Sequence, residues 1–143
     1  MWFETGADID APRERVWQVL TDVVRWPEFI PTMTRVTYAG DGPLGPGVRV
    51  RIKQPALPPM VWEVTEFTDG ASFAWRAASR GVVTVATHVL TPLPDGGVSL
   101  LLTLGQSGPL APLVGLLTGG RTRRYVRTEA ESLRLRCEAG PGY

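Results

Sequence analysis

The sequence is poor in the side chains that bind metals and form disulfides. It has one histidine, His88, one cysteine, Cys137, and one lysine, Lys53, among 143 residues. A single cysteine excludes an internal disulfide, and one histidine with one cysteine is too few for a zinc site of the usual kind. No acidic residues stand at metal-ligand spacing either. We therefore expect no bound metal and no cofactor.

Long apolar runs and a strong net charge are also missing. The longest apolar stretch, residues 110–117, is too short to span a membrane and is interrupted by proline. The first residues lack the basic segment and apolar core of a signal peptide, so we expect a cytoplasmic protein. The formal net charge is only +1, which argues against a protein dedicated to nucleic-acid binding.

The composition that remains is globular. Hydrophobic residues make up 43% of the chain and charged residues 20%. A chain of this length can bury a core of its own, so we expect one domain over residues 1–143.

The periodicity of the sequence predicts an α+β order. A strand over 2–9 is followed by a helix over 12–21, whose first turn suits Pro12, and by a short second helix over 22–26 that Asp22 can cap. Strands then follow over 33–38, 48–53, 60–67, 72–78, 82–90 and 98–105, and the short glycine-containing turns between several of them favour antiparallel hairpins. From residue 109 to about 137 the apolar period is again helical.

Such an order predicts a curved antiparallel sheet of six to seven strands wrapped around a long C-terminal helix. The helix is the only element long enough to cover one face of the sheet. A hollow between the sheet and the helix is then the expected place for a ligand.

Several short motifs, in this order along the chain, resemble the polyketide cyclase/dehydrase branch of the START/Bet v 1-like superfamily, the helix-grip fold. The motifs are Ala11-Pro12, Val16-Trp17, Leu20-Thr21-Asp22, Trp26-Pro27, Gly45-Pro46-Gly47-Val48, Trp62-Glu63-Val64-Thr65-Glu66, Phe73-Ala74-Trp75 and Gly96-Gly97. The resemblance runs from about residue 3 to residue 137. It implies the fold and a cavity for a small molecule, and it leaves the substrate open.

Residues 22–31 are also similar to a second group of the superfamily. This group contains quinone-binding COQ10-like and ribosome-associated toxin-like proteins, which carry a similar run of aspartate, aromatic, proline, phenylalanine and proline. It implies a non-catalytic lipid or quinone carrier or chaperone as the alternative function. A ribosome binder is disfavoured by the near-neutral charge.

His88 is the side chain best suited to proton transfer near neutral pH. Strand alternation groups it with Thr84 and Ala86, which are small and suit the wall of a cavity. We therefore predict that His88 faces inward as a catalytic acid or base. The alternative places it on the outer face, beside Thr103.

The other candidate ligand-binding residues are mostly aromatic or small and polar. Aromatic walls with few polar groups suit a flat or greasy ligand. Helical spacing puts the two threonines of the set one turn apart, where they orient a ligand or bond to their own helix. The predicted ligand-binding set is Phe29, Gln54, Trp62, Trp75, Thr118 and Thr122.

The long helix carries a cluster of four arginines: Arg121, Arg123, Arg124 and Arg127. We interpret the cluster mainly as a solvated part of the helix. The alternative is that Arg123 or Arg127 steers an anionic group. Cys137 is interpreted as a buried thiol rather than a nucleophile.

The sequence thus favours a protein that binds a hydrophobic small molecule and acts as a cofactor-independent cyclase or dehydratase on a polyketide-like intermediate. The expected partner is this ligand, and a carrier protein is a further candidate partner. We expect no nucleic acid and no membrane span, and the sequence leaves monomer and homodimer both open.

Overall fold

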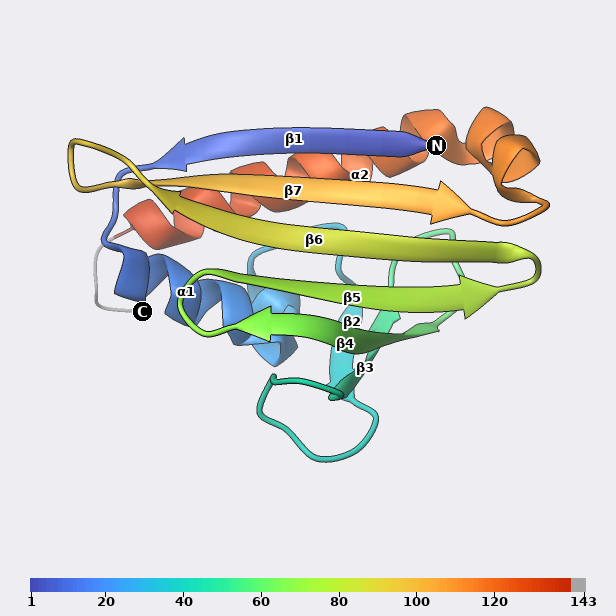
Figure 1. Cartoon of the computed structure of the whole chain (residues 1–143), viewed down its shortest axis with the longest axis horizontal. Helices are drawn as coiled ribbons and strands as arrows, with labels where there is room; N and C mark the ends of the chain where they lie inside the picture. The colour runs from blue at the N-terminus through green and yellow to red at the C-terminus, as the bar shows by residue number, and fades with distance from the viewer. Residues whose placement is uncertain (140–143) are drawn as a thin grey trace.

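The computed structural model describes residues 1–139 (Figure 1). Over these residues, seven strands, two α-helices and one 3-10 helix follow one another. Their bounds are β1 Trp2–Ile9, α1 Arg13–Thr21, η1 Val23–Glu28, β2 Arg35–Tyr38, β3 Arg49–Lys53, β4 Met60–Thr68, β5 Ser72–Ser79, β6 Val82–Pro92, β7 Val98–Ser107 and α2 Ala111–Glu138.

The strands form a single antiparallel sheet in the order β1-β7-β6-β5-β4-β3-β2. Neighbours from β2 to β7 are consecutive in the chain, and β1 pairs with β7, where Phe3 lies opposite Leu104. The first strand therefore closes the sheet beside the last one, which brings the start of the chain next to the start of α2.

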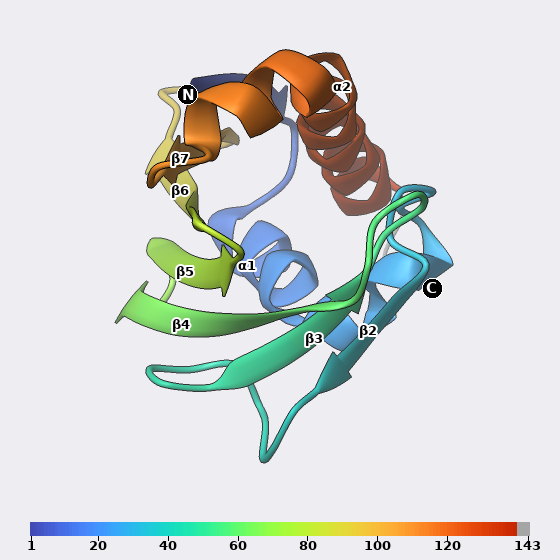
Figure 2. The same cartoon turned by 90° about the vertical axis from the view of Figure 1, so that its right-hand side faces the viewer.

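The sheet curves strongly, as the end-on view shows (Figure 2). It forms a wall from β1 and β7 through β5 to β3 and β2, and α2 lies across the concave side. The α1 helix closes the same interior at the end of the molecule where β1 finishes (Figure 1). The expected helix-grip fold, with two short helices after the first strand, is confirmed.

Two local predictions differ from the structure near η1. The second short helix is a 3-10 helix that extends to Glu28 and contains Pro27. The following strand starts at Arg35 instead of residue 33, because Met33 donates its backbone N–H to the carbonyl of Ile30 at 3.0 Å and completes a turn there.

The α2 helix is held at both ends. Gly115 faces the first residue so closely that a Cβ would collide with the Met1 side chain. At the other end, Arg15 donates to the carbonyls of Arg136, at 3.3 Å, and Cys137, at 3.5 Å. Within residues 1–139, no helix combines the length and the apolar character needed to cross a membrane.

The interior between sheet and helix is filled unevenly. Large apolar side chains fill the end near α1 and η1, including Leu20, Trp26, Ile30, Phe73 and Leu133. We call this end the closed half. Toward the other end, the inward-facing side chains become smaller or polar, and the interior is hollow there.

Candidate functional site

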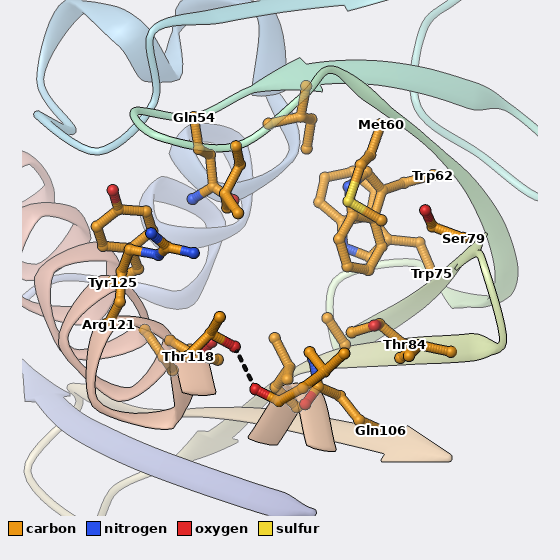
Figure 3. A pocket seen from close by; sticks show the side chains of 18 of the residues that line it. Gln54, Met60, Trp62, Trp75, Ser79, Thr84, Gln106, Thr118, Arg121 and Tyr125 are labelled. Atoms are coloured by element: carbon orange, nitrogen blue, oxygen red, sulfur yellow. Dashed lines mark hydrogen bonds between the residues drawn. The ribbon is translucent and has the colours of Figure 1, made fainter. Parts of the chain in front are cut away.

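A cavity of about 460 Å³ occupies the hollow end of the interior, between the sheet and α2. Arg121 and Tyr125 of α2 face Trp62 and Trp75 of the sheet across it (Figure 3). Thr84 and Gln106 lie along the strands that form its lower wall in this view. The wall is mostly apolar, with a few polar side chains converging on the same space, which is the usual composition of a small-molecule site.

The cavity arises from a change in side-chain size along two elements. On β6, Leu90 is packed in the core, whereas Ala86 and Thr84 line the cavity. On α2, Leu133 is packed in the core, whereas Thr122 and Thr118 line the cavity. The same strand and helix therefore form a packed end and an open end of the interior. The transition from packed to cavity-lining side chains lies at His88 on β6 and at Glu129 on α2.

His88 forms part of the inner end of this cavity and is 2% exposed. Its ring stacks on Phe73, with centroids 4.1 Å apart and an interplanar angle of 11°. The edge of Trp75 completes the packing at 5.4 Å and 87°. These two aromatic contacts fix the plane of the imidazole.

Glu129 of α2 lies next to His88 at the inner end of the cavity. Its Oε2 lies 3.7 Å from Nε2 of His88, which is within ion-pair range but longer than a hydrogen bond. Nδ1 of His88 is buried and has no hydrogen-bond partner within residues 1–139. Each ring nitrogen thus has capacity for a further polar contact.

The structure brings most of the predicted site residues together. Six of the seven line this cavity: Gln54, Trp62, Trp75, His88, Thr118 and Thr122. Phe29 does not line it, because at the end of η1 its ring packs, partly buried, against the core of the closed half, with the Arg136 guanidinium 4.8 Å from the ring centre. Thr118 uses its hydroxyl to donate to the carbonyl of Val114 at 2.7 Å, so that proton is not available to a ligand in this arrangement.

Three polar or charged lining residues on α2 were not predicted as site residues, namely Glu129, Arg121 and Tyr125. Arg121 was interpreted as solvated but faces the cavity. A signal was present in the helical spacing, because Thr118, Arg121, Thr122, Tyr125 and Glu129 are separated by three or four residues and so share one face.

Gln106 was missed for a different reason. It stands near the end of β7, beyond the predicted strand over 98–105. Strand β7 continues to Ser107, and the amide oxygen of Gln106 is buried without a partner within the described chain. An unpaired acceptor on a cavity wall marks a position where a ligand donor would be favourable.

The lining residues that are exposed locate the mouth of the cavity. They are Pro58, Ser79, Arg80 and Leu110. The loop that carries Pro58 is tied to α2, because the Tyr125 hydroxyl donates to the carbonyl of Pro55 at 2.6 Å. Lys53 also donates to the carbonyl of Gln54 at 2.7 Å. The mouth therefore lies between this loop, the β5–β6 turn and the first turn of α2.

The chemistry available at the site is proton transfer and shape selection. Among residues 1–139, no three His, Cys, Asp or Glu side chains gather as a metal site would require. The side chains suited to moving a proton are His88 and Glu129, at the inner end of the cavity.

A curved antiparallel sheet that encloses an apolar cavity against one long helix defines a protein with the helix-grip fold. A family model described as "Polyketide cyclase / dehydrase and lipid transport" matches residues 3–138. The chain belongs to this family.

Several solved structures with the same fold superpose on almost the whole chain. Hypothetical protein jhp0584 from Helicobacter pylori superposes with a TM-score of 0.83 at 17% identity, covering 96% of this chain and 88% of that one. The Zhui aromatase/cyclase from Streptomyces sp. R1128 gives 0.77 at 19% identity, with 96% and 93% covered. Ara h 8.0201 gives 0.66 at 11% identity, with 93% and 97% covered.

Identities this low show a shared fold and no more. A search of curated proteins finds no significant match.

Proposed function

We propose that the protein binds a hydrophobic, polyketide-like molecule in this cavity and catalyses its cyclisation or dehydration without a cofactor. The observation that carries the proposal is the position of His88, buried at the inner end of the cavity and facing Glu129 at 3.7 Å. A ligand that enters from the mouth reaches this pair only after it has left water. Family membership and the shared fold of an aromatase/cyclase support the same reading.

The proposed step is an intramolecular condensation. His88 removes a proton from a carbon between two carbonyl groups, and the resulting carbanion forms a bond to a carbonyl carbon further along the same molecule. The new alkoxide takes the proton back from His88. For dehydration, His88 removes a second proton from the ring and returns it to the departing hydroxyl group, which leaves as water.

The remaining cavity residues assist in other ways. Glu129 stabilises the protonated imidazole through its charge. The walls formed by Trp62, Trp75 and Met60 hold the ligand folded, so that the reacting carbons lie close together before the bond forms. Gln106 offers a buried acceptor for a ligand hydroxyl.

The test uses a synthetic poly-β-keto thioester as substrate and follows the cyclised product over time. We expect His88→Gln to lower the turnover by about 10²–10⁴-fold, the usual contribution of a general acid or base. Glu129→Gln should lower it less, and Glu131→Gln, on the exposed side of the same helix, should leave it unchanged. Native mass spectrometry and thermal unfolding of each variant separate lost chemistry from lost binding or folding. Full turnover by His88→Gln would refute the catalytic role.

A non-catalytic lipid or quinone carrier is the second candidate. Two features favour a carrier: the apolar lining of the cavity, and the exposed leucines at the start of α2, beside the mouth. In that case the protein purifies with a retained lipid or quinone, and His88→Gln retains the same amount. No wild-type turnover of the thioester, together with such a retained ligand, would decide for the carrier.

A further inference from the structure

The first turns of α2 expose an unusual amount of apolar surface. Leu116 is 81% exposed and Leu117 73%, and Leu113 is also exposed. Spacings of three and four residues put these three side chains on one side of the helix, while Gly115 and Gly119 face β1. We call Leu113, Leu116 and Leu117 the leucine face. Several large apolar side chains grouped on one surface usually mark a place where something binds.

The leucine face lies next to the mouth of the cavity. Leu110 and Val114, on the same turns of α2, line the cavity. The backbone N–H of Leu110 donates to the carbonyl of Gly81 at 3.1 Å, which holds the helix start against the β5–β6 turn. In Figure 2 these first turns of α2, drawn in orange, lie along the upper rim of the interior beside β7. Whatever covers the leucine face therefore also sits at the entrance.

The next turns of the helix carry positive charge. Arg123, Arg124 and Arg127 are exposed, and no aspartate or glutamate occurs between residues 111 and 128. The structure records no ion pair for these three arginines within residues 1–139, although Arg123 lies over the ring of Phe3 at 5.3 Å. On the helix surface, Leu113, Leu117 and Arg124 follow one another at spacings of four and seven residues, so apolar and cationic groups share one face.

We propose that this face of α2 docks the protein onto an anionic phospholipid bilayer. An apolar surface flanked by arginines is the pattern by which a helix lies in a membrane interface, with its leucines among the acyl chains and its cations at the phosphates. The leucines project from a convex helix surface and have no polar side chains among them, which suits a fluid hydrocarbon layer better than a shaped protein partner.

Docking in this way would place the mouth of the cavity against the lipid. A hydrophobic ligand could then pass between the bilayer and the cavity without crossing water. The proposal concerns the outer face of the helix and does not depend on whether His88 is catalytic. Its failure and the failure of the proposed reaction can therefore be told apart.

The first experiment measures co-sedimentation of the full-length protein with phosphatidylcholine vesicles that contain or lack phosphatidylglycerol. We expect the wild type to bind the anionic vesicles and to bind the neutral ones weakly. Leu116→Glu with Leu117→Glu should lower the binding by at least about tenfold, because two large apolar side chains can no longer enter the acyl layer. The matched control is Leu135→Glu, which changes a leucine that is 56% exposed at the other end of the same helix.

The second experiment tests the charge. Arg124→Gln with Arg127→Gln should weaken binding to anionic vesicles several-fold and reduce its dependence on salt. Arg49→Gln with Arg51→Gln removes the same charge from exposed positions on β3 and should have little effect. Thermal unfolding of all variants checks that each is folded, which is expected because every changed side chain is exposed.

Four outcomes would overturn the proposal. One is wild-type protein that stays in solution with both kinds of vesicle. The second is an equal loss of binding in Leu135→Glu and in the Leu116/Leu117 variant. The third is an equal loss in the β3 and α2 arginine variants, which would mean attraction by overall charge. The last is a wild-type dimer in solution that the Leu116/Leu117 change converts to monomer, with no vesicle binding, which would assign the face to a second copy of the chain.

Discussion

The two ends of the interior are built from the same strands and the same helix, yet they are organised differently. In the closed half, α1, η1 and the last turns of α2 pack large side chains against the sheet, and Trp26, Leu100 and Leu133 are fully buried. In the other half, which contains the cavity and which we call the hollow half, the same sheet faces Thr118, Thr122 and Val126 of α2. Dense packing in the closed half therefore stabilises the fold, so that the other half can hold a cavity.

The boundary between the two halves gives the site its chemical character. His88 packs on Phe73 from the closed half and lines the cavity of the hollow half. Its partner Glu129 lies one turn of α2 before Leu133, the first fully buried leucine of that helix. The pair is thus held by the rigid part of the core and remains within reach of a ligand.

The largest effect that distinguishes the two halves is expected from Trp26→Ala. Trp26 is 0% exposed and contacts Trp75 edge to face, with centroids 5.6 Å apart. Because the surrounding side chains cannot collapse into the space it leaves, we expect a loss of about 3–5 kcal/mol in the free energy of unfolding. Chemical denaturation measures this. A loss below about 1 kcal/mol would mean that the closed half is loosely packed.

Trp62→Ala provides the matched change in the wall of the hollow half. Trp62 is 8% exposed, but part of its surface borders the cavity instead of packed atoms. Its removal enlarges an existing space and breaks fewer contacts, so we expect a loss of about 1–2 kcal/mol in the free energy of unfolding. Binding of a hydrophobic fluorescent probe should weaken in this variant and stay nearly unchanged in Trp26→Ala. Equal destabilisation by the two changes would abolish the distinction between the halves.

The order of elements could be predicted from the sequence because each element carries its own periodicity. Short glycine-containing turns separate several of the strands, and the helical apolar period from residue 109 to about 137 predicts α2. The order of these elements predicts a curved sheet with a hollow under the long helix, and the family resemblance implies the same fold and a cavity for a small molecule. The predicted sheet of six to seven strands and the long helix are therefore confirmed, with small differences at the ends of the elements.

The details of the site were harder to predict because they depend on two elements meeting. Alternation could place His88 on one of two faces, but only the fold brings Glu129 opposite it. Arg121 belongs to a run of arginines that looks uniformly solvated in the sequence, although one of the four faces the cavity. Phe29 is the opposite case, a residue that was predicted to line the cavity and does not. Its position at the end of η1, and not the apolar character of the side chain, decides where its ring lies.

The smallest effect on stability is expected at Cys137, whose reactivity reports whether water reaches the closed half. Burial raises the pKa of its thiol to about 11 from an ordinary value of 9.0. The neutral thiol of the folded protein should therefore react very slowly with a disulfide reagent at pH 8 and rapidly once denaturant is added. Fast reaction in the folded state would mean that water reaches the last turns of α2.

The same pKa shift predicts a pH dependence with a definite sign. Above pH 9 the thiol ionises in the unfolded chain and remains protonated in the folded one, so its contribution to stability is present at neutral pH and is lost as the pH rises from 9 to 11. Relative to Cys137→Ala, the wild type should lose less than about 1 kcal/mol by pH 9.5 and nothing between pH 7 and 8. Parallel stability curves for the two proteins across this range would show that the thiol is hydrated, and the closed half would then not be closed at its helical end.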